Sequence, residues 1–199
     1  MITEENLESI LKELLPNNPI DSFSIKWILD SPKATEDSIR SVYTFLINNR
    51  LKDEKIATHA KLLGNDPKTI DRNYQHYVGL LRQNYKNRNS GKDILLNQVQ
   101  LLGISPNTME SNVQFLYGLG VDYNNGMLLG TKTQTKRQKM AWMLREMFDY
   151  RTVTEDRKRE AISGLYNFIK DNPRILIDSI NSMERKKYKL REKVKQYKV

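Results

Sequence analysis

Apolar residues recur every three or four positions along most of this chain of 199 residues. After Pro67, for example, they stand at Ile70, Tyr74, Tyr77 and Leu81. This spacing is typical of the buried face of an α-helix. No segment combines strand-like alternation with hairpin turn residues. The pattern therefore predicts an all-α fold. The expected helices span residues 3–15, 21–29, 33–50, 53–63, 67–86, 92–102, 106–121, 133–150, 154–170 and 173–197.

Four pairs of a small polar residue and a proline are expected to begin helices. The capping oxygen accepts a hydrogen bond from a free N–H group, and proline in the first turn loses no hydrogen bond. The four pairs are Ser31-Pro32, Asp66-Pro67, Ser105-Pro106 and Asn172-Pro173.

The stretch 61–80 returns 39 residues later as 100–119, with nine of twenty positions identical. A weaker copy, 128–150, aligns with 101–123, and it leaves room for only a short first helix. The segments 30–46 and 171–183 resemble the second helix of the unit. The identical pairs are Leu62/Leu101, Leu63/Leu102, Gly64/Gly103, Pro67/Pro106, Thr69/Thr108, Asn73/Asn112, Gln75/Gln114, Gly79/Gly118 and Leu80/Leu119.

Units of two helices bury a continuous core only when they stack on one another. The repeat therefore predicts a right-handed stack of two-helix units that forms a small α-solenoid or helical bundle. Gly64 and Gly103 are expected to end the first helix of their units in the left-handed conformation. The expected organisation is an acidic segment 1–50, tandem repeats 51–150 and C-terminal helices 151–199, all within one continuous domain.

The stretches 60–81 and 99–121 resemble the helix-turn-helix of response-regulator transcription factors. A small residue stands four positions before the turn glycine in each copy, at Ala60 and Val99. The resemblance implies that side chains of the second helix face the DNA groove. These are Lys68, Thr69, Asp71, Arg72 and Gln75 in the first copy and Asn107, Thr108, Glu110, Ser111 and Gln114 in the second.

The second copy lacks the charge that base reading normally accompanies. Between Pro106 and Val121 there is no Lys or Arg, whereas phosphate anchoring usually supports base contacts. We therefore predict that helix 106–121 is a packing element, with Val113 and Leu116 buried.

The motifs "LLGNDPKTI", "LLGISPNTM" and "NFIKDNPRILIDSI" also resemble the mitochondrial transcription termination factor family. That resemblance implies an all-helical, nucleic-acid-binding solenoid with repeats of roughly 30–40 residues. Two prolines here follow the glycine turn directly, where that family usually places them later. The likeness therefore concerns architecture and not membership.

Positive charge is concentrated near the C-terminus. Residues 128–199 carry 19 Lys and Arg against 9 Asp and Glu, whereas residues 1–50 carry 5 against 8. A polyanion would meet the C-terminal third first. A lysine-rich solvated surface without a ligand has the same composition, so that alternative stays open.

Two basic segments supply the candidate nucleic-acid contacts. Threonine hydroxyls beside the first suit phosphate, and Tyr188 and Tyr197 are interleaved with the charge of the second, as in nucleic-acid arms. A third basic segment, 157–159, has acidic neighbours and is expected to form ion pairs on a solvated helix. The candidates are Lys132, Lys136, Arg137, Lys139 and Arg145 in the first segment and Arg185, Lys186, Lys187, Lys189, Arg191, Lys193 and Lys195 in the second.

The last expected helix carries a heptad pattern at Leu176, Ile180, Met183, Leu190, Val194 and Tyr197. The first three are expected to pack on the preceding helix. No partner within the chain is evident beyond Lys187, and a lone helix of that length is marginal in water. We expect a polyanion to order this part, and deletion of residues 185–199 to leave the fold intact.

Enzyme chemistry has little support in this sequence. Cysteine is absent, and the two histidines, His59 and His76, stand apart from any acidic cluster. Gly-rich phosphate loops and the common hydrolase and metalloprotease motifs are missing too. We expect no catalytic activity, no metal and no cofactor.

The chain has no run of about 18 apolar residues, and its N-terminus, "MITEENLESILKELL", is too acidic for a signal peptide. We expect a cytoplasmic protein without a membrane partner. The predicted function is phosphate-directed binding of DNA or RNA by a helical-repeat protein, with a role in transcription or its regulation. The alternative is a scaffold that binds an acidic or helical protein partner.

Overall fold

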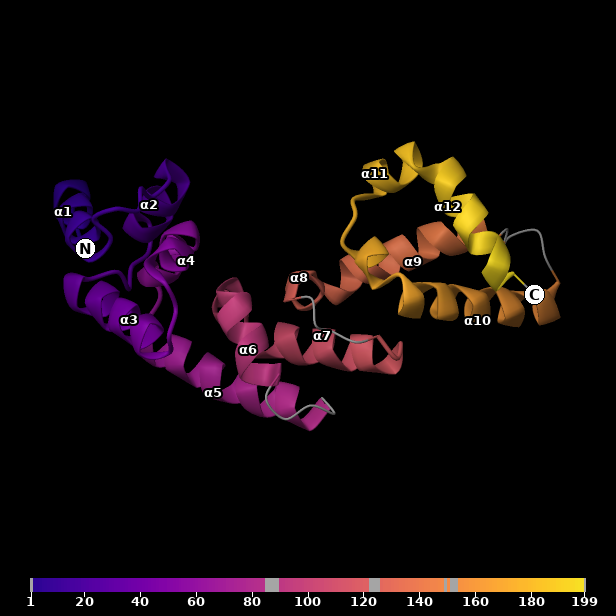
Figure 1. The fold of residues 1–199 in the computed structure, drawn as a ribbon, viewed down its shortest axis with the longest axis horizontal. Helices are drawn as coiled ribbons and strands as arrows, with labels where there is room; N and C mark the ends of the chain where they lie inside the picture. Colours follow the sequence, from indigo (N-terminus) through magenta and orange to yellow (C-terminus); the bar gives the residue numbers. More distant parts are fainter. Residues whose placement is uncertain (1, 85–89, 122–125, 149, 151–153, 199) are drawn as a thin grey trace. The chain divides into compact units, whose positions relative to one another are not determined.

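A computed structural model describes residues 2–84, 90–121, 126–148, 150 and 154–198 (Figure 1). These described residues form helices and connecting turns and contain no strand, which confirms the all-α prediction. The chain divides into two compact units, here called the N-terminal unit (Met1–Pro106) and the C-terminal unit (Asn107–Val199). The boundary lies inside the second repeat copy, whereas changes in charge and repeat pattern suggested divisions after residues 50 and 150.

In the N-terminal unit, α2 and α3 pack against the 3-10 helix η1, and α5 packs against α3, α6 and η2. Ile39, Leu63 and Tyr77 are among the side chains fully buried in this core. The elements are α1 (Glu4–Leu14), α2 (Ser22–Leu29), α3 (Glu36–Asn48), α4 (Asp53–Thr58), η1 (Ala60–Gly64), α5 (Pro67–Asn84), α6 (Ser90–Asn97) and η2 (Val99–Gly103).

In the C-terminal unit, α9 packs against α10, the 3-10 helix η3 and α12, and η4 packs against α10 (Figure 1). Met143, Leu165 and Phe168 are buried between these helices. The elements are α7 (Pro106–Gly118), which begins at the boundary residue, α8 (Gly126–Gly130), α9 (Thr133–Met147), α10 (Glu155–Asp171), η3 (Pro173–Leu176), α11 (Ile180–Arg185), α12 (Lys187–Val194) and η4 (Lys195–Tyr197).

Two of the four expected proline starts are confirmed. α5 begins at Pro67 and α7 begins at Pro106. The other two are wrong: α3 begins at Glu36, where Thr35 forms a capping box with Ser38, and Pro173 opens a 3-10 helix without a side-chain cap. A proline after a polar residue therefore does not by itself open an α-helix in this chain.

Three segments expected as continuous helices are interrupted. Segments 53–63 and 92–102 each consist of a short α-helix followed by a 3-10 helix, and segment 173–197 is divided into four short helices. The residue before each of the first two 3-10 helices has similar backbone angles, with φ −120° and ψ 31° at His59 and φ −132° and ψ 55° at Gln98. Asn172, before η3, has φ −129° and ψ 55°. The same bend thus precedes η1, η2 and η3.

Gly64 and Gly103 do not adopt the expected left-handed conformation. Among the described glycines, positive φ occurs at Gly120 alone. Their role is close packing. A Cβ on Gly64 would lie 3.1 Å from Cα of Ile28, and a Cβ on Gly103 would lie 3.1 Å from a methyl carbon of Leu62. A side chain at either position would push on a neighbouring element.

The same hydrogen bond recurs after each Leu-Leu-Gly motif. Asn73, nine residues after Gly64, donates to the Leu102 carbonyl at 2.8 Å, and Asn112, nine residues after Gly103, donates to the Leu129 carbonyl at 2.5 Å. In both cases a buried amide binds the leucine that precedes the next motif glycine.

Helix α7 packs through the face predicted for it. Val113 and Leu116 are fully buried, together with Met109 and Asn112. Both residues expected in the core are therefore confirmed there.

Candidate nucleic-acid interface

Two predicted contacts, Lys136 and Lys139, lie inside the C-terminal unit and not on its surface. Lys136 is 0% exposed and Lys139 is 5% exposed. The Lys136 ammonium donates to Oδ1 of Asn112 at 2.8 Å and to the Thr131 carbonyl at 2.5 Å. The Lys139 ammonium donates to the Leu176 carbonyl at 2.6 Å. Because both amines are enclosed and hydrogen-bonded, neither belongs to a surface that a polyanion can reach.

The repeat explains this burial. Lys136 and Lys139 follow Gly130 by six and nine residues, as Met109 and Asn112 follow Gly103. Lys136 thus stands at a core position, and Lys139 takes the place of the repeated asparagine and bonds a leucine carbonyl in the same way. The long, flexible stem of lysine is apolar, so it fills a core position when its ammonium finds acceptors.

Burial changes the titration of Lys136. Desolvation, assisted by the nearby positive charge of Lys139, lowers the pKa of Lys136 to about 7. Desolvation also lowers the pKa of Lys139. Both oxygens that accept from the Lys136 ammonium are neutral, so no carboxylate offsets the cost of burying its charge.

The other candidates on α9 and at its start are exposed but differ in their partners. Lys132 precedes the helix, and the Arg137 guanidinium lies 5.9 Å from the centre of the Phe115 ring. Arg145 pairs with Glu146 at 2.5 Å. Of these three, Arg145 is already neutralised by a neighbour.

The C-terminal segment is anchored to the unit, contrary to the expectation that it has no partner beyond Lys187. Leu190 and Val194 are buried, and the Tyr197 hydroxyl donates to Asp171 at 2.8 Å. A Cβ on Gly164 would overlap the Tyr197 carbonyl oxygen, so α10 approaches this segment backbone to backbone. The segment is part of the core, and we no longer expect its deletion to leave the fold intact.

Glu146, on α9, fixes one side of α12. Its carboxylate accepts from Lys187 at 2.7 Å, and its carbonyl accepts from Arg191 at 3.1 Å. Hydrogen bonds from Lys187 and Arg145 lower the pKa of Glu146 to about 2. Lys187 and Arg145 therefore act as internal ion-pair partners.

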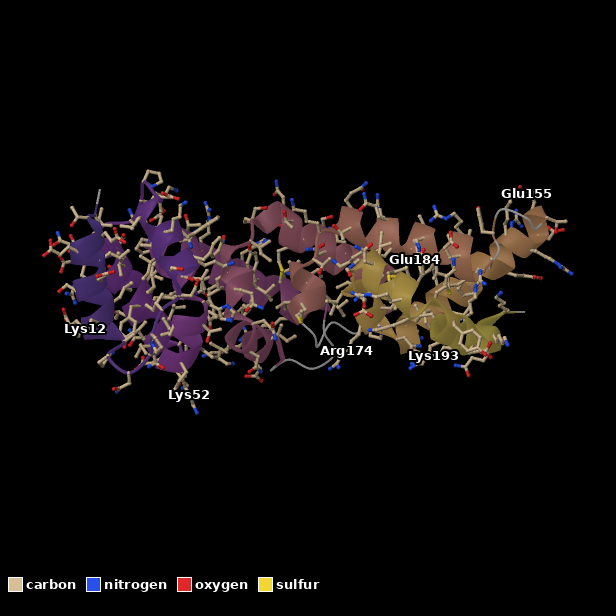
Figure 2. All side chains as sticks on the ribbon, turned by 90° about the horizontal axis from the view of Figure 1, so that it is seen from above. Lys12, Lys52, Glu155, Arg174, Glu184 and Lys193 are labelled. Atoms are coloured by element: carbon tan, nitrogen blue, oxygen red, sulfur yellow. The ribbon has the colours of Figure 1, made fainter. Side chains whose placement is uncertain are left out.

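The opposite side of α12 remains cationic and exposed. Lys186, Lys189 and Lys193 follow one another at helical spacing, and Arg174 of η3 lies across a groove of about 460 Å³. These four residues are called the basic face. In Figure 2, Arg174 and Lys193 lie along the same edge of the unit. The groove floor contains Phe168, Ile175 and Leu190, and Asp171 and Asp178 also line it.

Acidic residues compensate only part of this charge. Lys186 lies 3.5 Å from Asp178, whereas Lys189, Lys193 and Arg174 form no ion pair within the described part of the chain. Lys195 pairs with Glu192 at 2.7 Å, and Arg185 is exposed beside α12. Tyr188 is 78% exposed and does not line the groove.

Sequence reasoning missed Arg174 as a member of this face. It stands in "DNPRIL", where the Asn-Pro pair predicted a helix start and no charged surface. Its positive charge was the one signal in the sequence for including Arg174, and the turn at η3 is what brings it beside α12.

In comparisons with known proteins, no family model, no curated protein and no solved structure matches this chain. Over the described residues, no group of three or more His, Cys, Asp or Glu side chains is placed to hold a metal ion. Nor does any described helix have the length and apolar character needed to span a membrane.

Proposed function

We propose that the C-terminal unit binds nucleic acid through phosphate contacts on the basic face. The observation that carries this proposal is the fixed position of α12. Leu190 and Val194 are buried, and the Glu146 ion pair holds one side of the helix against α9. The lysines on the other side therefore form a cationic surface that is already in place, so that no flexible segment has to become ordered when nucleic acid binds.

The composition of the basic face favours phosphate over base contacts. Three of its four members are lysines, which act as point charges and carry no planar fork for reading a base edge. The C-terminal unit has 19 Lys and Arg against 11 Asp and Glu, whereas the N-terminal unit has 14 against 13. Binding of this kind is independent of sequence and weakens with salt. A role in transcription or its regulation is part of the proposal.

The test reverses two charges on the basic face, and a control makes the same charge change on the N-terminal unit. Lys189→Glu with Lys193→Glu should lower affinity for a labelled 20-base-pair DNA or 20-nucleotide RNA at least tenfold in fluorescence anisotropy. The slope of log affinity against log salt should fall by about two units, because two phosphate contacts are lost. Lys52→Glu with Lys68→Glu makes the same charge change on exposed residues of the N-terminal unit and should have a small effect.

Equal losses in both double variants would show that net charge, and not the basic face, controls binding. Unchanged affinity in the Lys189 and Lys193 variant, at unchanged helicity, would contradict the site. No binding of either polynucleotide by the unmodified chain at low salt would contradict the function.

We propose further that the chain is a stack of helical repeats. The support is the recurring bond from Asn73, Asn112 and Lys139 to the carbonyls of Leu102, Leu129 and Leu176. It connects each long helix to the short helix that opens or closes the following unit. A repeat stack offers an extended surface for a polymeric ligand, which agrees with a binding role and not a catalytic one.

A second candidate function is a protein-interaction scaffold. It is favoured by Phe23 and Trp27, which are 65% and 53% exposed on α2 with ring centres 6.4 Å apart. Paired exposed aromatics are typical of protein interfaces, and residues 1–50 are acidic overall. Phe23→Ser with Trp27→Ser should abolish association with a protein partner and leave polynucleotide affinity unchanged. Loss of both would indicate misfolding, which a circular dichroism spectrum detects.

A further inference from the structure

A second groove of the C-terminal unit lies between the end of α7 and one face of α10. It encloses about 540 Å³ and is distinct from the groove beside α12. The wall from α7 is formed by Gly118, Leu119 and Gly120. The α10 wall is formed by Arg159, Ile162, Ser163, Tyr166, Asn167 and Lys170.

The α10 wall presents an ordered series of chemical groups. Arg159, Ser163, Tyr166 and Lys170 are exposed and follow at intervals of four, three and four residues, so they lie on one side of the helix. The two cations are about 16 Å apart along the axis, from a rise of 1.5 Å per residue. The tyrosine lies between them, and its side chain is 43% exposed.

Among the described residues that line this groove, the charged side chains are Arg159 and Lys170, and none is acidic. Across the described residues, neither Arg159 nor Lys170 forms an ion pair, although the neighbouring Lys158 pairs with Glu155. The expectation that the whole segment 157–159 is neutralised by nearby acids therefore does not apply to Arg159.

On the α7 side of the groove, Gly118 and Gly120 have no side chains to fill the space. A Cβ on Gly118 would meet no atom within 4 Å, so open space lies beside it. Gly120 has φ +63°, and a Cβ there would lie 3.9 Å from Cδ of Lys170. A side chain at position 120 would thus be strained and would also narrow the groove.

We infer that this groove binds an unstacked nucleotide of a single-stranded nucleic acid. The Tyr166 ring stacks on the base, Arg159 and Lys170 contact the flanking phosphates, and the Asn167 amide meets the base edge. Single strands are bound by this combination of aromatic rings and cations, whereas the bases of a duplex are already stacked on one another and cannot lie on the ring. The inference rests on the proposed nucleic-acid binding and assigns a strand type to it.

The test uses the full chain with three probes: dT15, U15 and a mixed-sequence 15-base-pair DNA duplex. Tyr166→Ala should lower affinity for at least one single strand fivefold or more, because one stacked base is lost, and should leave duplex affinity unchanged. Tyr166→Phe keeps the ring and should bind as the unmodified chain does. The two single-stranded arms distinguish DNA from RNA.

Unchanged affinity of Tyr166→Ala for both single strands would overturn this inference. The proposed function would still stand in that case if the unmodified chain bound the duplex and the single strands. An equal loss for all three probes, or a lower melting temperature, would show a structural role for Tyr166 and would overturn it as well. If the unmodified chain bound none of the probes at low salt, the proposed function and the inference would fail together. A Lys170→Glu variant checks the charge: single-strand affinity should fall more than in Lys52→Glu, and equal losses would count against the groove.

Discussion

Helix α5 of the N-terminal unit and helix α9 of the C-terminal unit differ at two equivalent positions. α5 carries Ile70 and Asn73, six and nine residues after its motif glycine, and both are buried. α9 carries Lys136 and Lys139 at the same distances, and these are buried too. The repeat therefore accepts either an apolar and an amide side chain or two lysines at these core positions.

The difference teaches that charge counted in a sequence is not charge on a surface. Lys136 and Lys139 are buried, and Lys187 forms an ion pair with Glu146. The surface available to a ligand is smaller than the composition of the C-terminal unit indicates. Exposed cations lie on the basic face and along α10, and also at Lys132, Arg137 and Arg185.

The largest expected effect comes from removing the amide that faces a buried lysine. Oδ1 of Asn112 accepts from Lys136 at 2.8 Å, so Asn112→Leu would leave a buried ammonium with one neutral acceptor. The expected loss is about 2–3 kcal/mol in the free energy of unfolding, the range for a buried hydrogen bond to a charged group. Asn73→Leu removes a donor and a buried oxygen that has no partner, and it should cost about 1–2 kcal/mol. Urea unfolding measures both, and equal losses would contradict the role assigned to Lys136.

A smaller effect, counted per pH unit, concerns the pH dependence of stability. The folded pKa of Lys136 is lowered to about 7 from its ordinary value of 10.5, so between these pH values the unfolded chain binds a proton that the folded chain lacks. The free energy of unfolding should therefore rise with pH in this window, by at most ~1.4 kcal/mol per unit. Below pH 7 both states are protonated, and the contribution is constant.

Lys136→Met tests this dependence, because methionine occupies the equivalent position 109. The variant should lose most of the rise between pH 7 and 10, as followed by denaturant unfolding at several pH values, and the lowered pKa of Lys139 supplies what remains. Lys132→Met, at an exposed lysine, should retain the whole rise. An undiminished slope in Lys136→Met would assign the pH dependence to other groups.

The smallest effects separate two kinds of repeated glycine. Gly79 lies inside α5, and a Cβ added there would meet no atom within 4 Å, so Gly79→Ala should stabilise the protein by about 0.5–1 kcal/mol through helix propensity. Gly103→Ala would press on Leu62 and should destabilise the protein by about 1 kcal/mol. Melting temperatures should move in opposite directions, and a shift of the same sign would show that both glycines serve the same purpose.

Local sequence signals determined part of the fold. Apolar spacing located most of the helices. The starts at Pro67 and Pro106 were correct, whereas the same polar-proline pattern at Ser31-Pro32 and Asn172-Pro173 does not open an α-helix. The breaks at His59 and Gln98 were missed, because neither residue is a helix breaker. Propensity scales therefore gave no signal of these bends.

The candidate site was predicted less well, for a physical reason. Residue type placed Lys136 and Lys139 on the surface, because isolated lysines are rarely buried. The repeat alignment carried the contrary signal, since it set these lysines against Met109 and Asn112. Arg174 and the groove along α10 depend on contacts between elements distant in sequence, so the pattern of one segment could not indicate them.

The recurring bond to a leucine carbonyl also has a consequence for how the chain acquires its structure. Each donor reaches forward, across 29 residues from Asn73, 17 from Asn112 and 37 from Lys139. During synthesis from the N-terminus, the buried polar group of one helix stays unpaired until the next short helix has left the ribosome. Each long helix therefore completes its buried hydrogen bonds only when the next short helix is present. We expect folding to advance along the nascent chain in steps of one repeat.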